Sequence, residues 1–228
     1  MLKYIFFDLD DTILNFTAGE ANALSQALSE AGIIPTQAVL DRYHVINQAC
    51  WELLEEGRLT RDEVLVQRFE QLFLEMNIPY SGRDLCQRYE YLLSKQHAFM
   101  PDAEQLLREL SSKYRLYLAS NGASAVQRIR LRNADLTRYF RGIFISEELG
   151  VDKPKREFFQ MCFAAIPDFS RQTALIVGDS LTSDIRGGRN AGIRTCWYNP
   201  DRRTAPPGWE PDEEIAALAE LPTLLQRL

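Results

Sequence analysis

The sequence predicts an α/β protein with a parallel sheet and, inserted near its start, an all-helical segment. An apolar run at residues 3–7 has the length and composition of a buried strand. Residues 16–97 repeat apolar side chains at helical spacing without a strand signal, and from residue 98 onward short apolar runs alternate with helical patterns. Because alternating strands and helices form parallel βαβ units, we expect residues 1–15 and 98–228 to build one core.

The predicted insert contains four amphipathic helices, the first two ending near Gly32 and Gly57. Thr60 and Glu63 form a capping-box signature ahead of the third helix. The apolar positions that define the four helices are Leu24 and Leu28; Tyr43, Ile46 and Leu54; Leu65, Phe69 and Leu72; and Leu85, Tyr89 and Leu92. No strand signal interrupts this segment.

The core segments follow in regular alternation. After the strand at residues 3–7, further strands are predicted at residues 115–119, 142–145, 173–177 and 195–198, and helices near residues 103–110, 126–131, 158–163 and 185–191. Residues 199–214 are rich in proline, glycine and charge and predict a surface loop. We expect the last amphipathic segment, residues 215–228, to pack on the sheet.

Composition narrows the possible classes of function. The 228 residues carry a formal net charge of −6, which is unsuited to binding a nucleic-acid polymer. The four cysteines form no C-x-x-C pair, so neither a zinc site nor a disulfide framework is predicted. The N-terminal apolar run breaks at Asp8, too early for a signal peptide, and no stretch approaches the roughly 20 apolar residues of a membrane span. These features predict a cytoplasmic protein and give no indication of its oligomeric state.

Polar side chains collect where the predicted strands end. Asp8 follows the first strand directly, and Asp10 can point its side chain into the same space while Leu9 faces away. Because the carboxyl ends of parallel strands meet at one edge, we expect one cleft to hold these and the later polar positions. The later positions are Ser120, Asn121, Lys153, Asp179 and Asp184. An isolated D-x-D is more typical of a solvated turn that caps a helix, so the prediction depends on the whole set.

Two neighbouring carboxylates suit a reaction with two tasks. Asp8 can attack an electrophile as a covalent nucleophile, and Asp10 can give a proton to the leaving group and later take one from water. Thr12 can fix the carboxylates by hydrogen bonding. If the electrophile is a phosphoryl group, Ser120 and adjacent backbone N–H groups can hold its oxygens, and Lys153 supplies positive charge.

A divalent cation is expected beside these carboxylates. Asp8, Asp10, Asp179 and Asp184 carry up to four negative charges, which repel an anionic substrate unless a cation intervenes. Oxygen ligands without histidine or cysteine suit Mg²⁺.

The motifs resemble those of the haloacid dehalogenase superfamily. The four ordered motifs are Asp8-Leu9-Asp10-Asp11-Thr12, Ser120-Asn121-Gly122, Lys153-Pro154 and the segment from Gly178 to Asp184. The resemblance implies a Rossmann-like catalytic core of residues 1–15 and 98–228, with residues 16–97 as a helical cap. The four motifs span most of the chain, and the set is specific although each motif alone is weak.

By this resemblance, Asp8 becomes an aspartyl-phosphate and Asp10 is the acid and base. Mg²⁺ is then held by Asp8, Asp179 and the main-chain carbonyl of Asp10. Thr12, Ser120, Asn121 and Lys153 bind the substrate phosphate. Asp184 either orients Lys153 or a metal-bound water, or is an ordinary carboxylate at a helix start.

A narrower likeness is to the bacterial pyrimidine 5′-nucleotidases. It rests on three stretches: Tyr43, Ile46 and Asn47 with Trp51 and Gly57; Ile145 to Val151; and Thr195-Cys196-Trp197. It implies hydrolysis of nucleoside monophosphates such as UMP, dUMP and dTMP. In the cap, Phe16, Asn47 and Trp51 can stack on or hydrogen-bond a base, although Trp51 also fits a helical core position.

Several alternatives share part of this pattern. Phosphatases of other small metabolites, such as phosphoglycolate or a sugar phosphate, and sugar phosphomutases carry the same four motifs. A 2-haloacid dehalogenase lacks the second acidic residue, so Asp10 and Asp179 argue against it. A non-catalytic phosphate-sensing module would not need Asp10 or the long insert. A dinucleotide-binding protein is disfavoured because no G-x-G-x-x-G follows the first strand.

Overall fold

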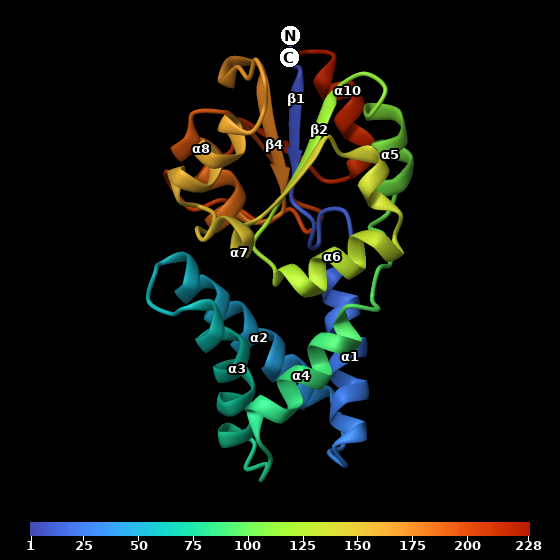
Figure 1. Ribbon diagram of the computed structural model, residues 1–228, viewed down its shortest axis with the longest axis vertical. Coiled ribbons are helices and arrows are strands. Elements are labelled where there is room, and N and C mark those ends of the chain that lie inside the picture. The colour runs from blue at the N-terminus through green and yellow to red at the C-terminus, as the bar shows by residue number, and fades with distance from the viewer. The chain divides into compact units, whose positions relative to one another are not determined.

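The computed structural model describes residues 1–228 and divides into two compact units. The core unit comprises Met1–Asn15 and Ala98–Leu228, and the helical unit comprises Phe16–His97. Figure 1 shows the strands gathered in the core unit and four helices in the other. The two units are described separately below.

The core unit contains one six-stranded parallel sheet in the order β3-β2-β1-β4-β5-β6. The strands are β1 (Tyr4–Phe7), β2 (Arg115–Ser120), β3 (Gly142–Ile145), β4 (Ala174–Gly178), β5 (Arg194–Tyr198) and β6 (Glu213–Ile215). The predicted parallel α/β class is therefore confirmed.

Strand β6 corrects one local prediction, because residues 199–214 were expected to form only a loop. Its three residues pair with β5, with Cys196 opposite Glu213 and Tyr198 opposite Ile215. Two of the three are glutamates, which suit an exposed sheet edge but hide the strand from a search for apolar runs.

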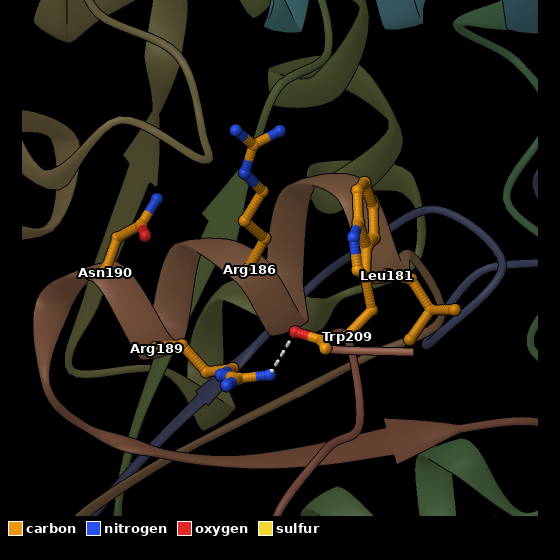
Figure 2. A pocket seen from close by; sticks show the side chains of 6 residues that line it. Leu181, Arg186, Arg189, Asn190 and Trp209 are labelled. Carbon is orange, nitrogen blue, oxygen red and sulfur yellow. Dashed lines mark hydrogen bonds between the residues drawn. The ribbon is translucent and has the colours of Figure 1, made fainter. Parts of the chain in front are cut away.

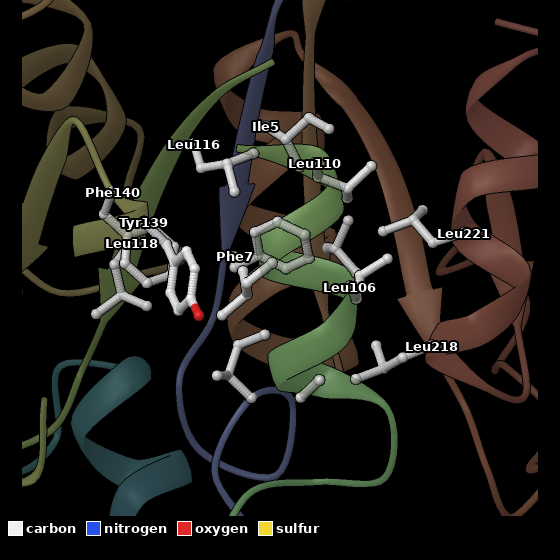
Figure 3. Close-up of a cluster of buried hydrophobic side chains, with 14 of the residues drawn as sticks. Ile5, Phe7, Leu106, Leu110, Leu116, Leu118, Tyr139, Phe140, Leu218 and Leu221 are labelled. Atoms are coloured by element: carbon white, nitrogen blue, oxygen red, sulfur yellow. The ribbon is translucent and has the colours of Figure 1, made fainter. Parts of the chain in front are cut away.

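Alternating side chains of each strand feed two separate apolar clusters, because successive strand residues point to opposite faces. Ile5 and Phe7 of β1 lie in one cluster, and Tyr4 and Phe6 lie in the other. Figure 3 shows the first cluster, where Leu106 and Leu110 of α5 (Ala103–Leu110) face β1. The strands are therefore buried on both faces, as an all-parallel sheet requires.

Helices cover both faces of the sheet. With α5, the C-terminal turns η4 (Leu218–Glu220) and α10 (Leu221–Leu225) contribute to the first cluster. Helix α8 (Arg156–Ala164) and the end of α9 (Arg186–Ala191) contribute to the second. Figure 1 shows α5 and α10 on one side of the strands and α8 on the other. The remaining elements are α6 (Ser124–Asn133), η1 (Leu136–Tyr139), α7 (Ser146–Leu149), η2 (Arg171–Thr173) and the π-helical turn η3 (Leu181–Ile185).

The helical unit consists of α1 (Phe16–Glu30), α2 (Gln37–Glu55), α3 (Arg61–Glu75) and α4 (Gly82–Leu93). The capping box of α3 is confirmed: the Glu63 amide donates to Thr60 Oγ1 at 3.3 Å, and the Thr60 amide donates to Glu63 Oε2 at 2.8 Å. In the interior of the helical unit, Tyr43, Phe69 and Tyr89 pack together, with ring centroids 5.0 to 5.7 Å apart. Three helices thus contribute to one aromatic core.

None of the helices combines the length and the apolar character that a membrane span requires.

The topology places β1 at the centre of the sheet. The chain runs outward from β1 through β2 to β3, then returns to the other side of β1 to form β4. In open parallel sheets a ligand crevice lies outside the carboxyl ends of the strands where the order reverses. Here that point lies between β1 and β4.

Candidate active site

Strand register brings the predicted polar positions to this edge. Phe7 pairs with both Leu118 and Val177, and the Asp8 amide still donates to the Val177 carbonyl at 3.0 Å. Asp8 and Asp179 therefore leave adjacent strands near the same level. Beyond Asp8, Leu9 is buried and its carbonyl accepts from the amides of Ile13 and Leu14, which folds the segment into a tight loop. Thr12, also buried, donates through Oγ1 to Asp179 Oδ1 at 3.3 Å and links that loop to β4.

Lys153 is the centre of the first polar cluster. Its ammonium, only 1% exposed, donates to Asp8 Oδ1 at 2.6 Å, Asp184 Oδ1 at 2.7 Å and the Ala119 carbonyl at 2.7 Å. These contacts use all three of its hydrogens. Asp184 is fully buried, and its second oxygen accepts from the Ser180 amide at 3.2 Å. The structure therefore places Asp184 against Lys153.

Gly178 makes room for this arrangement. A Cβ atom at that position would lie 2.2 Å from Asp184 Oδ2. Only glycine lets the end of β4 pass so close to the buried carboxylate.

Asn121 fixes the segment that carries Lys153. Its amide nitrogen donates to the Lys153 carbonyl at 3.0 Å, and its amide oxygen accepts from the Lys153 backbone N–H at 2.9 Å. The side chain thus grips both backbone groups of Lys153, and through them it sets where the ammonium enters the site.

The acidic side chains form a compact group of oxygen ligands. Asp8, Asp179 and Asp184 can each offer one carboxylate oxygen such that all three atoms lie within 4.8 Å of one another. No histidine or cysteine belongs to the group. Hard oxygen donors at this spacing suit a small divalent cation such as Mg²⁺.

Burial and mutual repulsion make these carboxylates hard to ionise. The pKa of Asp8 is raised to about 8, because burial raises it more than Lys153 lowers it and the charges of Asp184 and Asp10 add to the rise. Burial, then the charges of Asp8 and Asp184, raise the pKa of Asp179 well above its usual range. Burial disfavours the charge on Lys153, but Asp184 and Asp8 outweigh it and raise its pKa above the ordinary value. One lysine therefore does not balance the group, and another positive charge would favour full ionisation.

Asp10 belongs to a second polar cluster that the sequence did not reveal. Its carboxylate, 27% exposed, pairs with Arg130 Nη1 and accepts from Gln127 Nε2 at 2.6 Å. Gln127 and Arg130 lie three residues apart on α6, so they share one face of that helix. Both are 1% exposed. The only signal in the sequence was two polar residues at helical spacing soon after the Asn121-Gly122 turn.

The Ser120 hydroxyl is held between the two clusters. It is buried, and its oxygen accepts from Gln127 Nε2 at 2.9 Å and from the Gly122 amide at 3.1 Å. A serine oxygen has two acceptor positions and one donor. Since both acceptor positions are used, the O–H is left to donate to another group.

Comparison with known proteins identifies the family that carries this site. A family model for haloacid dehalogenase-like hydrolases matches residues 2–192. The chain belongs to this family of hydrolases.

Three relatives resemble this hydrolase over nearly its whole length. It is 40% identical over 220 residues to the pyrimidine 5′-nucleotidase PynA of Streptococcus pneumoniae, covering 96% of this chain and 93% of that protein. It is 32% identical over 222 residues to the pyrimidine 5′-nucleotidase YjjG of Escherichia coli, covering 97% of each. A magnesium-bound crystal structure of the HAD-hydrolase YfnB from Bacillus subtilis superposes with a TM-score of 0.94 at 42% identity, covering 98% of each chain.

The hydrolase's helical unit holds the three residues predicted to face a base. Asn47 is 3% exposed: its amide nitrogen donates to Glu20 Oε1 at 2.6 Å, and its oxygen accepts from Trp51 Nε1 at 3.1 Å and Arg68 Nη1 at 3.0 Å. Trp51 is half-buried, with the Arg61 guanidinium 5.5 Å from its ring centroid. Phe16, also half-buried, begins α1. Asn47 therefore holds Trp51 in place, and its own amide faces the interior of the unit.

A separate pocket of about 300 Å³ lies on the core unit, lined by Leu181, Arg186, Arg189, Asn190, Gly208 and Trp209. In Figure 2 Arg189 donates to the Gly208 carbonyl, a bond of 2.8 Å, and the Arg186 guanidinium lies 5.6 Å from the Trp209 ring centroid. The lining includes none of Asp8, Asp179 and Asp184. Its two arginines contact residues of the 199–214 segment.

Proposed function

We propose that the protein is a Mg²⁺-dependent phosphomonoesterase that works through an aspartyl-phosphate on Asp8. The observation that carries the proposal is a buried nucleophile, Asp8, gripped by Lys153 beside two further aspartates, with a second carboxylate, Asp10, two residues along the same loop. The set supplies a nucleophile, a proton carrier and positive charge for a phosphoryl group.

Mg²⁺ fits the donor set of this site. Asp8 and Asp179, with the main-chain carbonyl of Asp10, would hold it, and Asp184 would stay with Lys153 at the edge of the acidic group. When bound, the ion neutralises the crowded carboxylates and draws negative charge from the phosphoryl oxygens. The magnesium-bound structure of YfnB supports Mg²⁺ as the cation.

The first chemical step is attack by Asp8 on phosphorus. Lys153 holds Oδ1 of Asp8, which leaves Oδ2 as the attacking atom. The bond from Oδ2 to phosphorus forms as the bond from phosphorus to the ester oxygen breaks. Asp10 gives its proton to that departing oxygen, so the product leaves as an alcohol.

The second step restores the enzyme. Asp10, now ionised, takes a proton from a water molecule whose oxygen attacks phosphorus. The bond from phosphorus to Asp8 breaks, inorganic phosphate leaves, and Asp10 is again protonated. Throughout, the Ser120 O–H would bind a phosphoryl oxygen, and Lys153, whose three hydrogens are already used, would contribute its positive charge. Thr12 and Asn121 would fix Asp179 and the Lys153 segment.

Pyrimidine nucleoside 5′-monophosphates, such as UMP, dUMP and dTMP, are the proposed substrates. The proposal is supported by PynA and YjjG, which are named pyrimidine 5′-nucleotidases and are similar to this chain over nearly its full length. We assign substrate selection to the helical unit as a cap, with Phe16 and Trp51 as the aromatic groups and Asn47 as the residue that orients Trp51.

Phosphate release across a panel of esters tests this proposal. The panel contains UMP, dUMP, dTMP, purine monophosphates, phosphoglycolate and sugar phosphates, each assayed with Mg²⁺ and with a chelator. We expect Mg²⁺-dependent release with preference for the pyrimidine nucleotides. Activity confined to phosphoglycolate or a sugar phosphate would keep the chemistry and overturn the substrate; no release from any ester would overturn both.

A further inference from the structure

We infer that Gln127 and Arg130 are positioning residues that hold the Asp10 carboxylate in one orientation for proton transfer. The inference rests on the proposed function, because that proposal gives Asp10 its role as acid and base. Neither residue belongs to the four motifs, and both come from one face of α6.

The three side chains form a closed ring of hydrogen bonds. Arg130 Nη1 donates to Asp10 Oδ1 and, at 2.8 Å, to Gln127 Oε1. Gln127 Nε2 donates to Asp10 Oδ2 at 2.6 Å. Each oxygen of Asp10 therefore has its own donor, and rotation of the carboxylate would break both contacts. We call these three side chains the Asp10 ring.

The orientation of the Gln127 amide is fixed by its partners. Its oxygen faces a guanidinium donor, and its nitrogen faces two acceptors, Asp10 Oδ2 and Ser120 Oγ. Reversing the amide would place its oxygen against Asp10 Oδ2 and its nitrogen against Arg130 Nη1, at the cost of both of those bonds.

This one amide links the proposed acid and base to the proposed phosphoryl binder. By donating to Ser120 Oγ at 2.9 Å, it occupies an acceptor position of the hydroxyl and so helps to direct the Ser120 O–H outward. Removing it would loosen Asp10 and Ser120 together.

The backbone makes room for the ring at Gly122. A Cβ atom on Gly122 would lie 2.2 Å from Gln127 Nε2 and 2.6 Å from its Cδ. The turn after β2 therefore admits the amide only because residue 122 is glycine. Gln127 and Arg130 are each 1% exposed, and burying such polar side chains costs free energy unless they are hydrogen-bonded. Asp10 offsets part of this cost because it supplies a charged acceptor.

The leaving-group dependence of kcat/KM tests this inference. Phenyl phosphate needs a proton as its ester bond breaks, whereas p-nitrophenyl phosphate releases a stable anion without one. We expect Arg130→Met and Gln127→Met to lower kcat/KM for phenyl phosphate about 10- to 100-fold and to affect p-nitrophenyl phosphate much less. Arg130→Lys should recover part of the loss because it keeps a charge beside Asp10.

Arg128→Met is the matched control, since Arg128 lies on the same helix, is 41% exposed and pairs with Glu148. It should behave as wild type on both esters. Equal losses on the two esters for the ring variants, or no loss, would overturn the inference. Asp8→Asn separates this result from the proposed function: if wild type releases phosphate neither from these two esters nor from any ester of the panel, or if Asp8→Asn stays active, the proposed function itself fails and the inference with it.

Discussion

Two buried cations lie beside the D-x-D loop, and each holds one of its carboxylates. Lys153 and Arg130 are both 1% exposed; the first donates to Asp8 and the second to Asp10. The Asp8 side chain is 10% exposed and the Asp10 side chain 27%. The proposed nucleophile is therefore more deeply enclosed than the proposed proton carrier, which would exchange protons with an ester oxygen and with water.

The two cations also differ in how they bind these carboxylates. The Lys153 ammonium is a point charge that gathers Asp8, Asp184 and a backbone carbonyl around itself. The Arg130 guanidinium is planar and, with the Gln127 amide, binds the two oxygens of Asp10 from fixed directions. Charge concentration suits a nucleophile beside an anionic substrate, and directional bonding suits a group that must transfer a proton along one line.

The largest expected effect comes from Asp8→Asn. The amide keeps the size of the side chain but cannot form the acyl phosphate, so turnover should fall by at least about 10⁴-fold. Phosphate release at saturating substrate measures the loss, and circular dichroism shows whether the fold is retained. A folded variant with wild-type turnover would show that Asp8 is not the nucleophile.

Lys153→Met and Arg130→Met should differ in stability. The first leaves Asp8 and Asp184 buried against each other without a cation, and we expect a loss of about 3 kcal/mol in the free energy of unfolding. The second leaves Asp10 partly exposed and still bonded to Gln127, so its loss should be smaller. Urea unfolding measures both, and a larger loss for Arg130→Met would reverse the comparison.

A smaller effect is expected from pH in the metal-free protein. Because burial raises the pKa of Asp8 to about 8 from an ordinary 3.8, the folded state holds this proton more tightly than the unfolded state. The resulting stability is fully present below the ordinary value and is lost as pH rises through the raised pKa. The melting temperature in chelator should therefore fall as pH rises from about 4 to about 8, and Mg²⁺ should reduce the fall.

Asp8→Asn provides the control for that experiment, because an amide does not titrate. Its melting temperature should depend less on pH over the same interval. An equal slope in the two proteins would show that Asp8 is not the group responsible.

Residues that follow strands were predictable from the sequence, and residues within a helix were not. Asp8, Ser120 and Asp179 come directly after apolar runs, so the rule that parallel strands end at one edge was enough to place them together. The class of fold followed from the same runs. Strand β6 was not predicted, because a short charged edge strand has no apolar pattern.

Gln127 and Arg130 were not predicted from the sequence for a different reason. They sit in the middle of α6, where polar residues usually face solvent, and nothing local distinguishes them from the exposed Arg128. Their burial depends on how α6 packs against the loop after β1, more than 110 positions earlier in the chain, as the Asp10 contacts show. Asn47 likewise looked available to a ligand, and only its three bonding partners show that it faces inward.

The most direct test of the mechanism is to look for the aspartyl-phosphate itself. In Asp10→Asn the first step lacks its acid and the second lacks its base, so the substrate is p-nitrophenyl phosphate, whose leaving group needs no proton. Brief incubation with this ester and Mg²⁺, acid quench and peptide mass spectrometry should show phosphate on Asp8. The same digest of Asp8→Asn should show none. Absence of a modified peptide, while Asp10→Asn still releases about one equivalent of p-nitrophenol per enzyme, or a phosphate on another residue, would contradict the assignment of Asp8 as nucleophile.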